Sequence, residues 1–295
     1  MRTRRHFIQA SAALAGSGFL GATRRTHAAP SFEALESEFV RIERNSGGRL
    51  GVAVLDTASG QRIGHHAGDK FPMCSTFKLL AAAAVLKRVD DGRERLDRRV
   101  TYATSDLVTY SPITEKHVAD GMTLAELCDA AVTLSDNTAG NLILRSIGGP
   151  EGFTAFARSL GDTVTRLDRW ETELNEAVPG DPRDTTTPSA MLNNVHALVL
   201  GNTLTAASKE QLTKWLLGNK TGDTRIRANL PAGWRVADKT GSGERGSTND
   251  IGVIWPVGRA PVAVTIYLTE TTASADQRNA ALAAVGKTVA AAIGS

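Results

Sequence analysis

The sequence contains only two cysteines and no long hydrophobic run. Cys74 and Cys128 could form one bridge in an oxidising compartment, but two thiols do not make the disulfide framework of a small secreted fold. The most apolar early stretch, 8–22, is interrupted by three glycines and is shorter than the roughly 20 residues of a membrane-spanning helix. No later segment reaches that length, so we expect no membrane anchor in the processed protein.

Metal-binding motifs are also lacking. The six histidines are scattered and none forms HExxH or another ligand spacing, so the sequence predicts no metal and no cofactor. We interpret the adjacent pair His65-His66 as a solvated pair at the end of a strand.

The basic charge of the chain is concentrated at its N-terminus. The first 28 residues contain five Arg and no acidic residue, and without them the 31 Asp and Glu slightly outnumber the remaining Lys and Arg. Since a nucleic-acid-binding protein needs a basic stripe on its folded domain, we expect no nucleic-acid partner.

The same 28 residues indicate export. Their apolar, small-residue middle and Ala-containing end are typical of a signal peptide, and Arg4-Arg5 followed by Phe7 and Ile8 is typical of a twin-Arg signal. The alternative is a membrane anchor, which the short, glycine-interrupted apolar stretch disfavours. We expect cleavage near Ala28 and a periplasmic or secreted mature protein.

The pattern of periodicities predicts an α+β fold. Helices are expected over 31–44, 76–89, 124–134, 138–147, 151–160 and 273–293, and strands over 49–56, 61–66, 235–239, 250–255 and 261–269. Strands at both ends with helices between them imply a discontinuous α/β domain (29–66 and 220–295) with an all-helical domain (67–219) inserted. The segment 166–188 lacks a period and is expected to be a long compact loop. The active site is expected at the seam between the domains.

Ser75 and Lys78 could form a nucleophile and its activator. A helix brings side chains at i and i+3 to one face, and a serine at a helix start lies near unpaired N–H groups that favour negative charge. Taken alone, Ser-x-x-Lys is common, and the alternative is a capping serine with a lysine that reaches solvent.

Three further groups have the same double interpretation. Ser135 and Asn137 can project into a cleft or simply cap a helix, and Lys239-Thr240-Gly241 can offer donors to an anion or merely end a strand. Glu171 and Asn175 can jointly hold a water or belong to a charged surface loop.

The order of these groups is more specific than any one of them. STFK at 75, SDN at 135, ExxLN at 171 and KTG at 239 resemble the motif series of class A serine β-lactamases. Further matches are Tyr110 before SPITEKH and the runs GMTLAELCDAAVTLSDNTAGNLIL, VTRLDRWETELNEA and PAGWRVADKTGSGERGS. The resemblance covers essentially the whole mature chain. It implies an α/β/α sandwich with an antiparallel sheet and an inserted helical domain, and a monomer that acts on small-molecule β-lactams.

The resemblance also implies a set of roles for a cycle in which Ser75 is acylated and a Glu171-activated water then releases the product. Either Lys78 or Glu171 removes the serine proton, and the sequence leaves both open. The implied residues are Ser75, Lys78, Ser135, Glu171 and Asn175 for catalysis; the backbone N–H groups of Ser75 and Ser242 for the oxyanion hole; Tyr110, Asn137, Lys239, Thr240, Gly241, Ser242 and Arg225 for substrate binding; and Arg169 with Asp184 for an ion pair that pins the loop.

The sequence departs from the family pattern in places. Thr248 stands where many members carry a carboxylate-binding Arg, for which Arg225 is the expected substitute. Ala82 and Gly243 stand where some members place a second, disulfide-forming Cys. We therefore predict that both cysteines are free thiols.

Two rival functions share parts of the pattern. A cell-wall DD-peptidase and a penicillin-sensing domain would both acylate their serine without rapid hydrolysis, and Glu171 with Asn175 argues against both. The match of 241–246 to the dinucleotide fingerprint GxGxxG is discounted because a strand rather than a helix is expected to follow it.

Overall fold

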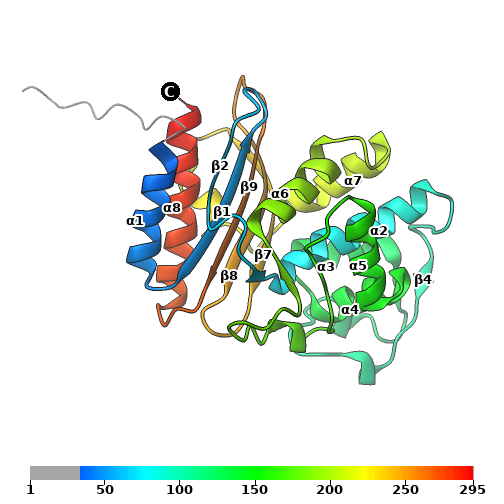
Figure 1. Ribbon diagram of the computed structural model, residues 1–295. Helices are drawn as coiled ribbons and strands as arrows, with labels where there is room; N and C mark the ends of the chain where they lie inside the picture. The colour runs from blue at the N-terminus through cyan, green and yellow to red at the C-terminus, as the bar shows by residue number, and fades with distance from the viewer. Residues whose placement is uncertain (1–33, 295) are drawn as a thin grey trace, which may run out of the picture.

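A five-stranded antiparallel sheet forms the middle of the computed structural model, which describes residues 34–294 (Figure 1). The strand order is β2-β1-β9-β8-β7. β1 (Arg49–Asp56) and β2 (Arg62–His65) come from the N-terminal part, whereas β7 (Arg235–Ser242), β8 (Thr248–Trp255) and β9 (Val262–Thr269) come from the C-terminal part. The predicted leader, 1–28, lies outside the described residues.

Two helices cover one face of this sheet. α1 (Leu35–Ser46) and α8 (Ala275–Ile293) pack side by side against it (Figure 1). Their contact face is an apolar core that includes Phe39, Val264 and Leu282. Because both faces of β9 are covered, all of its residues are buried, and its sequence VAVTIYLT is mostly apolar rather than alternating between apolar and polar residues.

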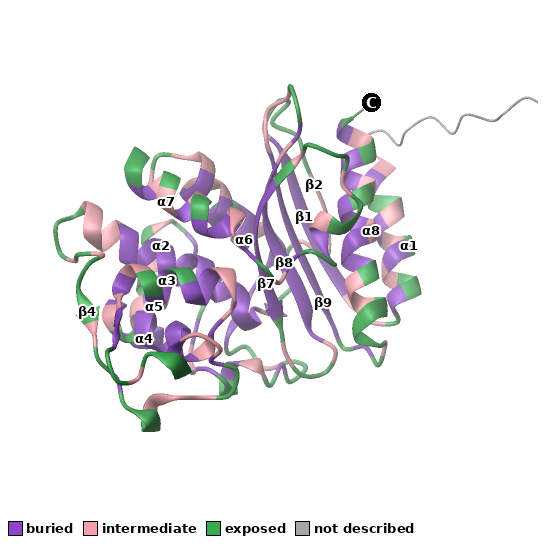
Figure 2. Ribbon diagram, turned by 180° about the vertical axis from the view of Figure 1, so that it is seen from behind, coloured by how far each residue is buried: buried purple, intermediate pink, exposed green. Residues whose placement is uncertain are grey.

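The opposite face carries the helical part of the chain. α6 (Pro188–Val195) packs directly on the sheet, and beyond it lie α2 (Phe77–Asp90), α3 (Leu124–Thr133), α4 (Asn137–Ile147), α5 (Gly149–Ser159) and α7 (Ala206–Leu217). α2 is buried from Phe77 to Leu86, as expected for a helix that is apolar all round, and Figure 2 shows it enclosed by its neighbours.

The structure refines several expectations. The region 67–219, expected to be all-helical, also contains two short ladders, β3 (Phe71–Pro72) with β6 (Thr185–Thr186) and β4 (Arg99–Val100) with β5 (Met122–Thr123). Each ladder joins segments far apart in sequence, which local periodicity does not reveal.

Within residues 34–294, no helix combines the length and the apolar character needed to cross a bilayer.

Candidate active site

Ser75 lies in a 3₁₀ turn, Cys74–Thr76, that leads into α2. Its Oγ accepts a hydrogen bond from Lys78 Nζ at 2.9 Å and donates to Glu171 Oε1 at 3.1 Å. The predicted helical spacing therefore brings the amine to the hydroxyl, and a distant loop adds the carboxylate. One hydroxyl lies between two groups that could accept its proton.

Lys78 is fully buried, and each partner of its amine is an oxygen. Besides Ser75, Nζ donates to the carbonyl of Ser135 at 2.9 Å and to Asn137 Oδ1 at 2.6 Å, and it lies 2.9 Å from Glu171 Oε1. Burial lowers the pKa of Lys78, and the Glu171 carboxylate opposes this shift. A lysine with a lowered pKa can act as a base more readily than an exposed one.

The lysine stem fits against a helix that offers no side chain at the point of contact. A Cβ on Gly140 of α4 would lie 2.7 Å from Lys78 Cε. Glycine at 140 thus lets α4 and α2 approach closely enough for Lys78 to reach Ser75.

The Glu171 carboxylate is held from both of its oxygens. Oε1 faces Ser75 and Lys78, and Oε2 accepts from Asn175 Nδ2 at 2.5 Å. Among the described residues, the buried Oδ1 of Asn175 has no hydrogen-bond partner. A buried acceptor beside a carboxylate is an arrangement that a water molecule can complete.

Asn141 is a site residue that the sequence did not reveal. Its side chain, on α4, donates to the Glu171 carbonyl at 3.0 Å and accepts from the Glu171 N–H at 2.9 Å. The available signal was its position one helical turn after Asn137, since residues at i and i+4 share a face. Spacing alone does not show that this face of α4 meets the backbone of Glu171.

The predicted ion pair of the 166–188 loop is present in the structure. Arg169 Nε lies 2.6 Å from Asp184 Oδ2, and Asp184 Oδ1 also accepts from the N–H groups of Asp168 and Arg169. Asp184 is buried. One carboxylate thus joins the two ends of the loop that carries Glu171.

β7 lines the other side of the cleft. Lys239 Nζ donates to Ser135 Oγ at 3.0 Å and to the Thr240 carbonyl. Burial, followed by the positive charges of Lys78 and Arg225, holds the pKa of Lys239 well below its ordinary value. A Cβ on Gly241 would lie 2.9 Å from the Met73 carbonyl, so glycine lets this strand approach the turn that carries Ser75.

Arg225 reaches the same end of β7 from the segment before it. Its guanidinium donates to the carbonyls of Gly241 and Asn249 and, at 2.7 Å, to Ser242 Oγ. Thr248, at the position of the missing family Arg, instead accepts from Arg278 at 2.9 Å.

Ser75, Ser135 and Asn175 line one cleft of about 290 Å³. Tyr110 lines this cleft, and its side chain is about half exposed. The backbones of Tyr110 and Ser135 both have a positive φ. All the predicted substrate-binding residues except Lys239, which reaches the cleft through Ser135, line this cavity: Tyr110, Asn137, Arg225, Thr240, Gly241 and Ser242.

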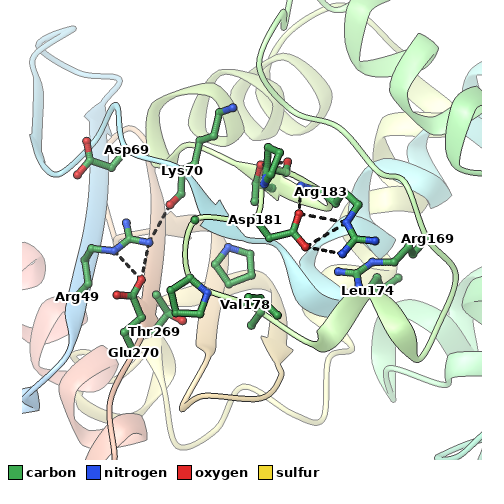
Figure 3. A pocket seen from close by; sticks show the side chains of 16 residues that line it. Arg49, Asp69, Lys70, Arg169, Leu174, Val178, Asp181, Arg183, Thr269 and Glu270 are labelled. Carbon is green, nitrogen blue, oxygen red and sulfur yellow. Dashed lines mark hydrogen bonds and ion pairs between the residues drawn. The ribbon is translucent and has the colours of Figure 1, made fainter.

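A larger cavity of about 470 Å³ lies at the 166–188 loop (Figure 3). Arg49 is paired with Glu270 and Arg183 with Asp181, so its charged groups largely satisfy one another. Its lining includes neither Ser75 nor Glu171, and it is therefore not the catalytic cleft.

The prediction of two free thiols is confirmed, because Cys74 and Cys128 are both free and buried. The interpretation of His65-His66 as a solvated pair is wrong for His65. Its side chain is only 10% exposed and Nε2 lies 2.8 Å from Glu43 Oε2 on α1, a contact across 22 residues that no local pattern indicates.

Comparison with known proteins gives one consistent result. Residues 34–293 match the model of the "Beta-lactamase enzyme family". β-Lactamase AST-1 of Nocardia asteroides is 51% identical over 88% of this chain and 84% of its own length. β-Lactamase CTX-M-8 of Citrobacter amalonaticus is 51% identical over 86% of this chain and 88% of its own.

Solved structures agree. An ancestral class A β-lactamase (GNCA) superposes with a TM-score of 0.86 at 65% identity, covering 86% of this chain and 98% of that one. A putative class A β-lactamase, PenP of Rhodopseudomonas palustris, has the same TM-score and identity over 87% and 98% of the two chains.

Proposed function

The chain belongs to the class A β-lactamases, and from this premise we propose how its own residues divide the chemistry. It is a serine hydrolase that opens the amide bond of β-lactam antibiotics and confers resistance to them. The observation that carries the assignment of residues is the contact of Ser75 Oγ with both Lys78 and Glu171.

In the first step, Ser75 Oγ attacks the lactam carbonyl and its proton passes to Lys78 Nζ or to Glu171 Oε1, both within hydrogen-bond distance. The carbonyl oxygen becomes an oxyanion that accepts from the backbone N–H groups of Ser75 and Ser242. The Ser135 hydroxyl, beside Lys239, gives a proton to the lactam nitrogen as its bond to the carbonyl carbon breaks. The proton taken from Ser75 then passes to Ser135, so that Lys78 and Glu171 return to their starting protonation states.

In the second step, a water held by Glu171 and Asn175 attacks the ester. The unpartnered Oδ1 of Asn175 and the carboxylate of Glu171 supply two acceptors for its protons. Glu171 takes one proton from the water, the ester bond to Ser75 breaks, and this proton passes to Ser75 Oγ to restore the hydroxyl. This deacylation separates a hydrolase from a protein that merely binds penicillin.

Substrate binding falls to the rest of the cleft. Lys239, Thr240 and Ser242, backed by the buried Arg225, face the substrate carboxylate, and Asn137 contacts its side-chain amide. Tyr110 forms the wall of the entrance.

Replacement of the carboxylate tests this division. Glu171→Ala should leave Ser75 acylation measurable while an adduct of substrate mass accumulates on the protein, since only deacylation loses its base. The control is Glu173→Ala, which removes an exposed carboxylate from the same loop and should turn over normally. An intact Glu171→Ala protein that forms no adduct, or that hydrolyses at the wild-type rate, would refute the assignment.

A DD-peptidase or a penicillin-sensing domain would give a burst without turnover. Sustained hydrolysis of a chromogenic cephalosporin by the wild-type chain excludes both rivals in one measurement.

Export and assembly are proposed from the sequence. Residues 1–28 are proposed to direct twin-Arg export to the periplasm or the medium, where a monomer meets its substrate. Processing of an Arg4→Lys, Arg5→Lys chain should fail, and light scattering of the processed protein should give the mass of one chain.

A further inference from the structure

Three potential metal ligands meet on the side of the molecule remote from the catalytic cleft, where the end of α1 faces the edge strand β2. Glu43 lies on α1, and His65 and His66 lie at the end of β2. His65 Nε2 is 2.8 Å from Glu43 Oε2, and His66 Nε2 is 3.4 Å from Glu43 Oε1. A single ligand atom from each residue lies within 4.8 Å of the other two.

The backbone explains how two adjacent histidines face one carboxylate. Successive side chains of a strand point to opposite faces, but His66 has a φ of 47°, outside the strand conformation. This turn brings the two imidazoles to one side, with ring centroids 4.3 Å apart.

A fourth residue supports the cluster from behind. Asp69 Oδ2 lies 3.0 Å from His66 Nδ1, a contact that favours the tautomer with its proton on Nδ1, in which Nε2, the nitrogen that faces Glu43, can bind a cation. A carboxylate on the remote nitrogen of an imidazole is the usual support of a metal-ligating histidine. The Glu43 carboxylate is itself oriented, since its Oε1 accepts from the Leu50 N–H at 3.0 Å.

We propose that Glu43, His65 and His66 form a zinc-binding site, with Asp69 as the residue that orients His66. Two imidazole nitrogens and one carboxylate oxygen are a zinc ligand set. Zinc bonds near 2.1 Å place tetrahedral ligand atoms about 3.4 Å apart, which matches the 3.4 Å between His66 Nε2 and Glu43 Oε1. The His66 side chain is 40% exposed, so water can occupy the fourth position.

Binding would cross-link two parts of the fold. The site joins α1 to β2, the outermost strand of the five-stranded sheet, and a ligand that binds only the folded chain raises its unfolding temperature. For His65 to ligate as a neutral imidazole, the proton on Nε2 must move to Nδ1 or, from the doubly protonated ring, be released to solvent, because zinc binds an unprotonated nitrogen.

The test uses the full chain purified without a polyhistidine tag and stripped with a chelator. Titration with zinc chloride followed by calorimetry should show one equivalent of zinc that is lost in His66→Ala and in Glu43→Gln. Asp69→Asn should bind about 10- to 100-fold more weakly. His196→Ala, which removes a histidine elsewhere on the molecule, should bind like the wild type.

Thermal unfolding supplies a second readout that does not depend on hydrolysis. Zinc at about 100 times its dissociation constant should raise the unfolding temperature of the wild type by roughly 5–10 °C, and EDTA should reverse the rise. The zinc-free variants should unfold near the wild-type temperature, which shows that they are folded. Equal zinc binding by wild type, His66→Ala and Glu43→Gln, or no zinc-dependent shift in the wild type, would overturn the proposal.

Discussion

The side-chain amide of Asn141 is paired with the backbone of Glu171, donating to its carbonyl at 3.0 Å and accepting from its N–H at 2.9 Å. A residue of a rigid buried helix thus determines where a loop carboxylate stands. Position, rather than charge, is what Asn141 contributes to the site.

Asn141→Leu is expected to impair deacylation more than acylation. Each buried backbone group left without its partner costs about 1–3 kcal/mol, so the loop should shift and the turnover number should fall roughly 10- to 100-fold. Mass spectrometry during turnover should show an accumulating adduct on Ser75. Asn193→Leu, on an exposed position of α6, is the control, and an unchanged turnover number in Asn141→Leu would contradict the positioning role.

Asp184→Asn should loosen the loop that carries Glu171. The substitution removes the buried carboxylate partner of Arg169 and leaves it only the exposed pair with Glu176, and we expect the free energy of unfolding to fall by about 1–3 kcal/mol. Chemical denaturation measures this loss of stability. The ratio of cephalosporin turnover to penicillin turnover shows whether the change in the loop alters substrate preference. Asp181→Asn breaks the more exposed pair with Arg183 and should change stability by less than about 1 kcal/mol. If Asp184→Asn leaves both stability and preference unchanged, Asp184 does not pin the loop.

The activity should decline at alkaline pH because of Lys239. Burial and the neighbouring cations Lys78 and Arg225 lower the pKa of Lys239, so its proton is lost below the ordinary lysine value of about 10.4. Above the lowered pKa, the amine no longer attracts the substrate carboxylate, and kcat/KM falls. Lys239→Arg keeps its charge and should move this limb to higher pH. An identical alkaline limb in both proteins would assign it to another group, with Lys78 the nearest candidate.

The lowered pKa of Lys239 also makes the stability of the fold depend on pH. A lysine whose pKa is lower in the folded than in the unfolded chain destabilises the fold while it is protonated. Its unfavourable contribution therefore disappears as the pH rises from the folded pKa to the unfolded one. The unfolding temperature of Lys239→Leu at neutral pH should accordingly equal or exceed that of the wild type.

Arg225→Ala should weaken binding of substrates that carry a carboxylate. The guanidinium supports Ser242 Oγ at 2.7 Å, and its loss should raise KM about 10-fold or more, equivalent to roughly 1.4 kcal/mol, with a smaller effect on kcat. Arg235→Ala, at the exposed start of β7, is the matched control. If Thr248→Arg restores KM in the Arg225→Ala background, the contribution of Arg225 is its positive charge. A KM unchanged by Arg225→Ala would exclude a role of Arg225 in substrate binding.

Cys74 and Cys128 should be inert in the native protein. Burial raises the pKa of both thiols above the ordinary value, and the thiolate is the reactive form. A colourimetric thiol reagent should detect no group in the native, unreduced protein and two after denaturation. Detection of none after denaturation would indicate a disulfide.

Local patterns predicted the elements whose own residues decide their structure. β1 was predicted with both its ends because Arg49–Asp56 is an apolar strand sequence bounded by Gly48 and Thr57, and α4 was predicted to within one residue. β7 was predicted to end at Lys239 but extends to Ser242, because its ladder with β8 continues through Gly241 opposite Asn249. That extension depends on a partner strand and not on local propensity.

The site residues also divide into those that a short motif reveals and those that depend on a contact between distant elements. The groups that react occur in short motifs, so Ser75, Lys78 and Glu171 could be singled out from the sequence. Asn141 and the contact of Glu43 with His65 could not, because each depends on two elements meeting in space.

The pairing of β1 with β9 joins Arg49 to Thr269 and Asp56 to Val262 across most of the chain. During synthesis, the first strand must therefore wait for one of the last segments to leave the ribosome before it has a neighbour on that side. Within the described residues, β7, which lines the catalytic cleft, joins the sheet through β8, and β8 in turn pairs with the late-arriving β9. Contacts between residues so far apart in sequence make folding slow. We therefore expect the chain to hydrolyse substrate only after its C-terminal strands have been synthesised.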